Sequence, residues 1–402
     1  MSLDAAITAK PTRLEGKPLL FFLTLLAALG MLATNMYLAS FPSLGKELAA
    51  TSAQVKLTLT VFLLGFAGGQ LIVGPLSDRY GRRPLLLAGL VVYAATGVFI
   101  ALSVSIEWMI GLRIAQAVGA CTGSVLARAV ARDLFSGDAL TRSLGLVTTL
   151  TAAAPGFSPL IGGLIETYFG WRGTFLLLAF VGVFAATIVW LRVPETHRER
   201  DSAPGLGAAF ASYLTLLRER SFMVPALATT CAMTGLFAFF ASSPGIFIER
   251  FGVPPALFGF IPCATVFAVF AGGFSAPRLA KRWPGYRPVL LGLGMMIFGS
   301  TVMLGISFAN PGMFQVLGAL VFFLFGMGIV NPLATVFALR PFPEKAGAAS
   351  ALIGCFQMAG GALGTALVSA LPYPALPALP MVMMGGAVAG LLVVWLGGRA
   401  GR

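Results

Sequence analysis

Side chains that could carry a charge or a proton are scarce inside the long apolar runs of this sequence. Arg113 is the one basic residue well inside a run, and Gln116 follows it at a spacing that places both on one helix face. The first run carries the polar pair Asn35 and Tyr37, and no Asp or Glu falls in the middle of any run. The runs therefore lack the clustered acids and histidines that a membrane enzyme needs.

Other chemical motifs are also missing from the sequence. The four cysteines lie far apart in apolar runs without CxxC or metal-ligand spacing, which is typical of small core residues. The one histidine, His197, lies in a charged segment, and no GxxxxGK[ST] loop is present to bind ATP. We therefore expect no enzyme activity, no metal and no cofactor.

The composition restricts the class of protein. The chain has 402 residues, of which 58% are hydrophobic and 10% charged, with a mean hydropathy of +0.91. Soluble domains carry about 25% charged residues, so the chain is predicted to be an all-α integral membrane protein. The net charge of +13 is spread over short loops between apolar runs. It indicates membrane topology rather than nucleic-acid binding.

Apolar runs of about 20 residues, long enough to cross a bilayer, form two sets of six. The predicted spans are 18–41, 55–76, 84–104, 107–130, 140–165, 171–192, 221–245, 254–279, 287–308, 311–339, 346–371 and 377–397. Twelve spans in two pseudo-symmetric six-helix halves are typical of transporters built from repeats. The predicted halves are 18–192 and 221–397, with a linker at 193–220 and tails at 1–17 and 398–402.

The basic residues also predict the orientation of the chain. Of the 27 Lys and Arg, 22 fall in the tails or in loops on the same side of the membrane, and four fall in the opposite loops. Because Lys and Arg accumulate on the cytoplasmic side, we expect both termini and the linker to be cytoplasmic.

The most distinctive stretch lies between the second and third runs and reads Gly74-Pro75-Leu76-Ser77-Asp78-Arg79-Tyr80-Gly81-Arg82-Arg83-Pro84. Its charges exclude it from hydrocarbon, so we expect an aqueous loop in which Gly74 and Gly81 allow a tight turn. Asp78 would accept from a helix N-terminus or pair with Arg79 or Arg82, and Pro84 would open the next helix.

This stretch resembles the loop signature of the major facilitator superfamily of transporters, between that family's second and third helices. The resemblance implies the fold of that family, with a central cavity between two halves. It also implies a conformational latch at the cytoplasmic end, in which Asp133 would pair with Arg79 or Arg128. The predicted latch residues are Gly74, Asp78, Arg79, Gly81, Arg82, Arg83, Arg128 and Asp133.

Two further segments carry the same resemblance. The residues from Arg113 to Ala120 resemble the fourth-helix motif of the superfamily, which implies that Arg113 faces the interior; the alternative is an Arg that reaches the outer interface. The fifth span resembles the motif of the antiporter branch, which implies export. Its predicted hinge residues are Pro155, Gly156, Pro159, Gly162 and Gly163.

The first span ends Thr34-Asn35-Met36-Tyr37-Leu38-Ala39-Ser40-Phe41-Pro42, and Thr58-Leu59-Thr60, Leu64-Gly65-Phe66-Ala67-Gly68-Gly69-Gln70 and Ala131-Arg132-Asp133-Leu134-Phe135 follow. These segments are similar to the bicyclomycin/chloramphenicol-resistance (Bcr/CflA-type) drug-export branch. Members of that branch usually carry Asp-Met-Tyr-Leu-Pro in the first span, whereas this chain has Asn35 and Ala39 at the Asp and Pro positions. In the family pattern that Asp would carry the transported proton, and Asn35 cannot ionise. Either a native Asp was replaced, or the natural protein carries Asn and couples protons differently or not at all.

The resemblance implies a secondary active exporter of small amphiphilic or neutral antibiotics, driven by the proton gradient in the parental family. We expect a monomer in a bacterial inner membrane, with a drug, protons and lipid as its partners and no nucleic acid. An uptake or facilitative carrier of a small polar metabolite is the alternative. The predicted cavity residues are Asn35, Tyr37, Arg113, Gln116, Phe237, Phe240 and Asn331.

Overall fold

The computed structural model describes residues 17–196 and 206–399 of the chain, and the elements in this part are helical. Most of the two predicted tails, part of the predicted linker and His197 lie outside the described residues. The elements are α1 (Lys17–Asn35), η1 (Met36–Ser40), α2 (Phe41–Glu47), α3 (Ser52–Tyr80), α4 (Arg82–Ala101), α5 (Ile106–Leu134), α6 (Gly137–Arg192), α7 (Leu206–Arg218), α8 (Arg220–Pro244), η3 (Gly245–Arg250), α9 (Pro255–Phe258), α10 (Phe260–Arg282), α11 (Arg287–Ser307), α12 (Met313–Leu339), η4 (Pro343–Lys345), α13 (Ala346–Ala370) and α14 (Ala375–Arg399).

Helices long and apolar enough to cross a membrane make up nearly all of the described chain. There are 11 such stretches, and the longest, α6, has 56 residues. It breaks at Gly170, whose φ of 66° and ψ of −177° are not helical, so α6 supplies two spans. With its two arms counted separately, the described residues contain the twelve spans predicted, and the all-α membrane fold is confirmed.

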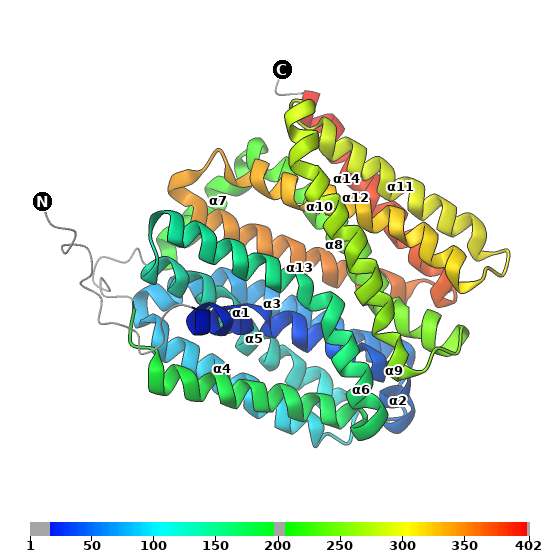
Figure 1. Cartoon of the computed structure of the whole chain (residues 1–402), viewed down its shortest axis with the longest axis horizontal. Helices are drawn as coiled ribbons and strands as arrows, with labels where there is room; N and C mark the ends of the chain where they lie inside the picture. Colours follow the sequence, from blue (N-terminus) through cyan, green and yellow to red (C-terminus); the bar gives the residue numbers. More distant parts are fainter. Residues whose placement is uncertain (1–16, 197–205, 400–402) are drawn as a thin grey trace, which may run out of the picture.

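The helices form two bundles, α1–α6 and α8–α14, which meet at an angle (Figure 1). Across the boundary α3 packs along α13, and α6 packs against α9 and α10. Helix α7, within the predicted linker, lies beside α3, α8 and α13. Its Tyr213 hydroxyl donates to the Leu71 carbonyl at 3.0 Å, so the linker helix is attached to the first bundle as well as the second.

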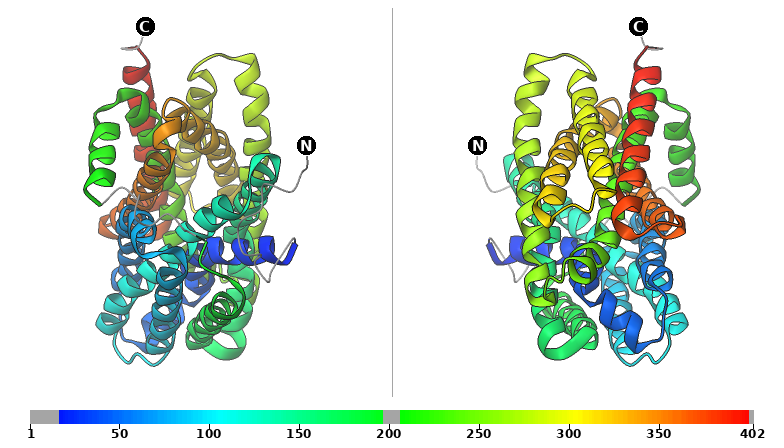
Figure 2. Two further views of the ribbon diagram at one scale, coloured as in Figure 1. Left: turned by 90° about the vertical axis from the view of Figure 1, so that its left-hand side faces the viewer. Right: turned by 90° about the vertical axis from the view of Figure 1, so that its right-hand side faces the viewer.

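The two ends of the molecule differ. We define the linker end as the end that holds the Gly81 turn, α7 and the N-terminus of α8. The far end holds η1, α2, η3 and α9 (Figure 2). At the far end α3 begins with a capping box, in which the Thr51 amide donates to Gln54 Oε1 at 2.8 Å and the Gln54 amide donates to Thr51 Oγ1 at 3.2 Å. A cap of this kind stabilises a helix by about 1 kcal/mol.

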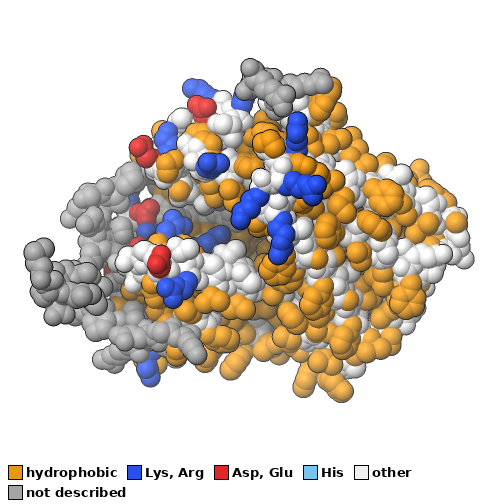
Figure 3. Space-filling view, turned by 45° about the horizontal axis from the view of Figure 1, so that its top comes forward, with side chains coloured by type: hydrophobic (Ala, Val, Ile, Leu, Met, Phe, Trp, Pro, Cys, Tyr) orange, Lys and Arg blue, Asp and Glu red, His pale blue; other side chains and the backbone are white. Residues whose placement is uncertain are grey.

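The exterior of the bundles is hydrophobic. Large apolar side chains such as Trp190, Phe180 and Phe314 are exposed, and the exposed fraction of Phe314 is 81%. In a soluble protein this exposed apolar surface would promote aggregation. In a bilayer the same surface is covered by lipid chains. Lys and Arg gather on one part of the visible surface, around a hollow, with hydrophobic side chains over much of the rest (Figure 3).

The predicted aqueous loop at Gly74–Pro84 is wrong in its extent. Helix α3 continues through Pro75 to Tyr80, and α4 begins at Arg82, so one residue separates the two helices. That residue is Gly81, with φ of 100°, a backbone conformation that side chains with a Cβ rarely adopt. Gly74 is helical and makes no turn. The polar residues that follow the apolar run continue α3 as far as Tyr80, because their backbone groups still gain helical hydrogen bonds.

Candidate functional site

A cavity of about 310 Å³ lies between the two bundles, within the range of small-molecule binding sites. Helices α1, α5 and α6 form one wall, and α8, α10, α12 and α13 form the other. The second wall is largely apolar and contains Phe237, Phe239 and Phe240. The rings of Phe237 and Phe240 meet edge to face at 5.6 Å between centroids, an arrangement that aromatic pairs favour.

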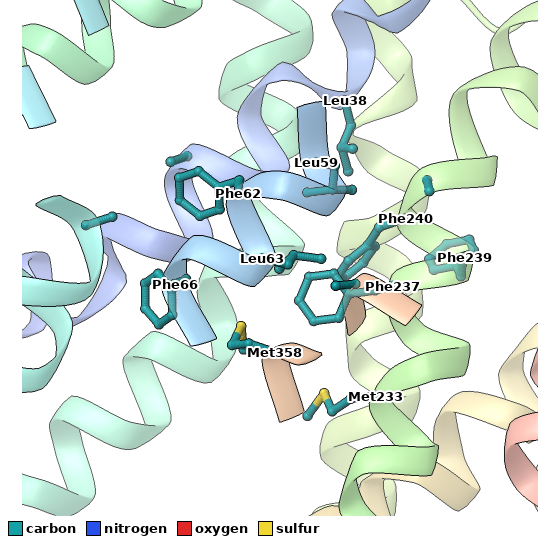
Figure 4. Packing of buried hydrophobic residues seen from close by; sticks show 14 of the residues in the cluster. Leu38, Leu59, Phe62, Leu63, Phe66, Met233, Phe237, Phe239, Phe240 and Met358 are labelled. Atoms are coloured by element: carbon teal, nitrogen blue, oxygen red, sulfur yellow. The ribbon is translucent and has the colours of Figure 1, made fainter. Parts of the chain in front are cut away.

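Methionines add adaptable surface to this cavity. Met31, Met233, Met327 and Met358 all line it, and they come from four different helices. Thioether side chains rotate freely and fill irregular gaps, so this lining accommodates apolar bodies of more than one shape. Figure 4 shows Met233 and Met358 on the same side of the cluster; Met233 is on α8 with Phe237 and Phe240, and Met358 is on α13. Nothing in the sequence distinguishes these methionines, because a Met in an apolar run usually packs in the core.

A small set of polar side chains interrupts the apolar lining. Gln357 Nε2 donates to Asn331 Oδ1 at 3.0 Å, which joins α12 to α13 at the cavity wall. On the facing wall Ser124, Thr148 and Thr151 line the space, and the buried Thr151 hydroxyl has no hydrogen-bond partner among the described residues. These groups can orient a bound molecule through one or two hydrogen bonds.

The structure places Arg128 in this cavity. Its side chain is exposed and lines both the central cavity and a second one, of about 410 Å³, at the linker end. Asp78, Arg82 and Asp133 line the second cavity as well. The two spaces therefore adjoin at Arg128, which lies between the central cavity and the linker end.

Toward the far end the cavity is closed by packing between the bundles. Leu59 and Leu63 of α3 lie on the side of that helix facing Phe237 and Phe240 of α8 (Figure 4), and all four side chains belong to one buried cluster. A hydrogen bond of 2.7 Å between Thr60 Oγ1 and Thr365 Oγ1 connects α3 to α13 near this closure.

Arg113 is fully buried within the first bundle rather than at its outer interface. Its Nη1 donates to Gln116 Oε1 at 2.7 Å and its Nε to the Thr58 carbonyl at 3.4 Å. The guanidinium lies 4.2 Å from the ring centre of Phe62 and 4.5 Å from that of Tyr37. Cation–π contacts of this kind are worth up to about 2 kcal/mol when desolvated. Neither the central cavity nor the second cavity includes Arg113, Gln116 or Tyr37 in its lining.

Asn35 is also fully buried, at the junction of α1 and η1. Its amide nitrogen donates to the Met31 carbonyl and to Thr34 Oγ1, both at 2.9 Å. Its Oδ1 has no hydrogen-bond partner among the described residues. The predicted cavity residues thus fall into two places: Phe237, Phe240 and Asn331 line the cavity, whereas Asn35, Tyr37, Arg113 and Gln116 lie inside the first bundle.

The Gly- and Pro-rich stretch of α6 lies where the bundles meet. A Cβ on Gly162 would overlap the carbonyl oxygen of Met36 in η1, and one on Gly163 would overlap the carbonyl oxygen of Pro255 in α9. A Cβ on Gly156 would lie 2.7 Å from Val266 of α10. Glycine is required at 162 and 163 because backbones approach there, and Gly156 leaves room for the Val266 side chain. Pro155 and Gly156 also line the cavity, and Pro159 lies inside the helix between them and Gly162.

Arg82 is the centre of the charged network at the linker end. Its guanidinium pairs with Asp78 and with Ser77, and its Nε contacts Asp133 Oδ2 at 3.3 Å. The predicted pairing of Asp133 with Arg79 or Arg128 is not what forms: Arg79 stacks on Tyr80 and Arg128 lies in the cavity. Arg82 reaches Asp133 because it is the first residue of α4, which packs against α5.

Glu195 completes this network and was not selected from the sequence. Its carboxylate accepts from the backbone amides of Arg82 at 2.9 Å and Arg83 at 3.3 Å. An acidic group at a helix N-terminus satisfies free amides and the helix dipole. The Arg83 guanidinium donates to the Trp190 carbonyl at 2.7 Å, so the end of α6 is tied to the start of α4. The only feature of the sequence that points to Glu195 is its position shortly after a predicted span.

The described residues contain no group of three or more His, Cys, Asp or Glu side chains able to hold a metal ion.

The sequence matches the family model of the Major Facilitator Superfamily over residues 23–365. The chain belongs to the major facilitator superfamily. It is a multi-pass membrane transporter rather than an enzyme, and the family predicted from the loop signature is confirmed.

Relatives in the superfamily support the drug-export branch predicted from the first span. A chloramphenicol resistance protein of Pseudomonas aeruginosa is 33% identical over 354 residues, covering 87% of this chain and 82% of that protein. A bicyclomycin resistance protein homolog of Haemophilus influenzae (strain ATCC 51907 / DSM 11121 / KW20 / Rd) is 30% identical over 371 residues, covering 92% and 93%.

The fold is also that of a solved superfamily transporter. A bacterial homolog to the human lysosomal transporter Spinster, in an inward-facing and occupied conformation, superposes with a TM-score of 0.76 at 16% identity. The alignment covers 97% of this chain and 98% of that one. At this identity the likeness concerns the fold alone.

Proposed function

We propose that this transporter exports small amphiphilic or neutral antibiotics from the bacterial cytoplasm. The observation that carries the proposal is the cavity of about 310 Å³ with its Phe and Met lining and few polar groups. Such a lining binds apolar bodies of varied shape through area rather than through a fixed set of hydrogen bonds. The relatives named for resistance to chloramphenicol and to bicyclomycin point to the same class of substrate.

Transport follows from alternation between two arrangements of the bundles. The central cavity adjoins the linker-end cavity at Arg128, and the Phe237–Phe240 cluster and the α6 glycines pack on its far-end side. Rocking of one bundle against the other about the bound drug would separate the far-end contacts and close the linker end. A bound drug favours whichever arrangement gives it more contacts.

The linker end faces the cytoplasm in this proposal, with both termini on that side of the bacterial inner membrane. The basic residues gathered near the hollow in Figure 3 support this orientation, because cytoplasmic loops carry the excess of Lys and Arg. The transporter works as a monomer here, since one chain contains both bundles and the whole cavity between them.

Energy for export comes from the proton gradient in the parental family, with no cofactor. In this chain the family's carboxylate position holds Asn35, whose amide accepts and donates hydrogen bonds but does not titrate. No Asp or Glu is among the residues that line the central cavity. We therefore infer that coupling through position 35 is disabled, and that this chain binds drug without concentrating it against a gradient.

The test is export of chloramphenicol, first in an efflux-deficient bacterium and then in proteoliposomes. In cells the chain should leave the growth-inhibitory concentration of chloramphenicol nearly unchanged, because it does not concentrate the drug outside. In proteoliposomes it should accelerate equilibration of labelled chloramphenicol without a pH gradient. Phe240→Ala, in the cavity wall, should slow equilibration, whereas the matched Phe314→Ala on the lipid-facing surface should not. No acceleration by the unmodified chain would contradict drug export.

The same assay separates the alternative of a carrier for a small polar metabolite. The Asn331–Gln357 pair is the feature of the cavity that favours a polar solute most, because its two amides offer both donors and acceptors. In that case chloramphenicol would neither be transported nor protect the chain against thermal unfolding, whereas a polar solute would do both.

A further inference from the structure

The central cavity carries its charge on one side only. Arg128 is the one charged side chain among the residues that line it, and it lies one helical turn after Ser124 on α5. No hydrogen bond or ion pair joins Arg128 to another described residue, although its side chain is exposed to the space. The cavity therefore presents an unpaired guanidinium to whatever enters it.

Three acidic side chains line the second cavity together with Arg128, and two of them are engaged in ion pairs. Asp78 and Asp133, which share the second cavity with Arg128, both pair with Arg82, and Asp133 also accepts from Thr196 Oγ1 at 2.9 Å. Arg132 lies four residues further along α5, and its positive charge acts on the positive charge of Arg128. The third acidic side chain, Glu344, is next in sequence to Lys345, which lines the same cavity. The second cavity thus has four basic and three acidic side chains in its lining, and no acidic side chain lines the central cavity, so the local charge is positive.

The facing wall supplies the complementary part of a recognition site. Phe237, Phe240 and Met327 present apolar surface across the space from α5. A molecule that fits both walls has an aromatic or aliphatic body and an acceptor group at one end. A guanidinium donates through a planar fork that matches a carboxylate or sulfonate, and such charge-assisted hydrogen bonds are roughly twice as strong as neutral ones.

We propose that Arg128 selects the substrate by charge, so that the cavity prefers anionic aromatic amphiphiles to neutral ones and excludes lipophilic cations. This inference rests on the proposed function and specifies its substrate class. Neutral antibiotics with strong acceptor groups remain substrates, because a neutral oxygen still accepts from Arg128. A cation meets a like charge that no carboxylate of the lining neutralises, and it loses the hydration that it had in water.

The test is binding of three probes with one ring system and three charges: naphthylacetate, naphthylacetamide and naphthylethylammonium. The full chain is placed in nanodiscs of uncharged, zwitterionic lipid, so that the membrane itself does not sort the probes. Titration calorimetry gives each dissociation constant. We expect naphthylacetate to bind about tenfold more tightly than naphthylethylammonium, a ratio that corresponds to about 1.4 kcal/mol, with naphthylacetamide between them.

Variants of Arg128 assign the selectivity to this side chain. Arg128→Gln should bring the three constants within about twofold of one another, and Arg128→Glu should reverse their order, since the sign of the local charge is reversed. Arg128→Lys should keep the order with a smaller spread, because it retains charge but not the planar fork. Arg132→Gln, which lines the second cavity but not the central one, is the matched control and should keep the order.

Naphthylacetamide serves as the internal check on folding, since its affinity should change little in every variant. The inference is overturned if the unmodified chain binds the ammonium probe as tightly as the acetate, or if Arg128→Glu keeps the original order while still binding the amide. Failure of the proposed function gives a different result: the charge order is present in binding, yet neither chloramphenicol nor the amide crosses the proteoliposome membrane.

Discussion

The far end and the linker end of this transporter are held by different forces. At the far end the two bundles touch each other, through Gly163 against Pro255, the Thr60–Thr365 hydrogen bond and the apolar cluster around Phe240. At the linker end the ion pairs of Arg82 join α3, α4 and α5, all within the first bundle. The far end is closed by packing between bundles, whereas the linker-end charges make one bundle rigid.

This difference indicates what each end contributes to the transport cycle. Contacts between bundles must break when the cavity opens to the other side, so their strength sets the balance between the two arrangements. Contacts within a bundle persist through a rigid-body rotation and affect the balance less. Substitutions at the far end should therefore have the larger effects, and those at the linker end the smaller ones.

The largest effect is expected from Gly163→Val. Its side chain would collide with the backbone of α9, which cannot move aside as a flexible side chain can, and overpacking typically costs about 1–3 kcal/mol. The far end should no longer close, and chloramphenicol transport in proteoliposomes should fall to background. Gly145→Val on the same helix, where no atom lies within 4 Å of the new Cβ, is the control and should transport normally. Normal transport by Gly163→Val would show that the glycine contact does not close the far end.

The next largest effect is expected from Arg113→Ala. The change removes cation–π contacts to Phe62 and Tyr37 and leaves Gln116 Oε1 without its donor; an unpaired buried acceptor costs about 1–3 kcal/mol. Transport should be lost and the melting temperature lowered. Arg113→Lys should recover only part of both, because an ammonium cannot stack between rings as a guanidinium does. Full activity in either variant would contradict an interior role for Arg113.

Asn35→Asp tests whether the buried polar residues inside the first bundle, near Asn35, can take up a proton. The carboxyl would supply the titrating group that the family pattern has at this position, and its Oδ1 would remain the unpartnered atom that Asn35 has now. Export of chloramphenicol against its gradient should appear only when a pH gradient is imposed. Asn35→Gln, an amide of different length, is the control and should stay uncoupled.

The opposite outcome is equally informative. If the chain with Asn35 already concentrates chloramphenicol with a pH gradient, position 35 is not the coupling site. Glu166 is then the group to examine, because its Oε2 is buried and has no hydrogen-bond partner among the described residues. It lies on α6 between the far-end contact at Gly163 and the break at Gly170.

The sequence predicted the features that depend on local composition. Span positions, the turn at Gly81 and the interior position of Arg113 follow from hydropathy, backbone sterics and the cost of charge in lipid. The pairing partners did not follow. Whether Asp133 pairs with Arg79, Arg82 or Arg128 depends on how α4 packs against α5. That packing cannot be read directly from the sequence. Arg128 was assigned to the latch for this reason, although it lines the cavity.

The smallest effect is expected from Asp78→Ala at the linker end. Arg82 would lose one carboxylate but keep Asp133, and its backbone amide would keep Glu195, so α3, α4 and α5 should stay joined. A partly exposed ion pair contributes about 0.2–1 kcal/mol. Transport should fall to roughly half, and chloramphenicol affinity should stay within about threefold, which is less than 0.7 kcal/mol. Asp138→Ala, in the first turn of α6, is the control. A collapse of affinity with normal conformational cycling would mean that Asp78 acts on the substrate site, and that the two ends are not separate in function.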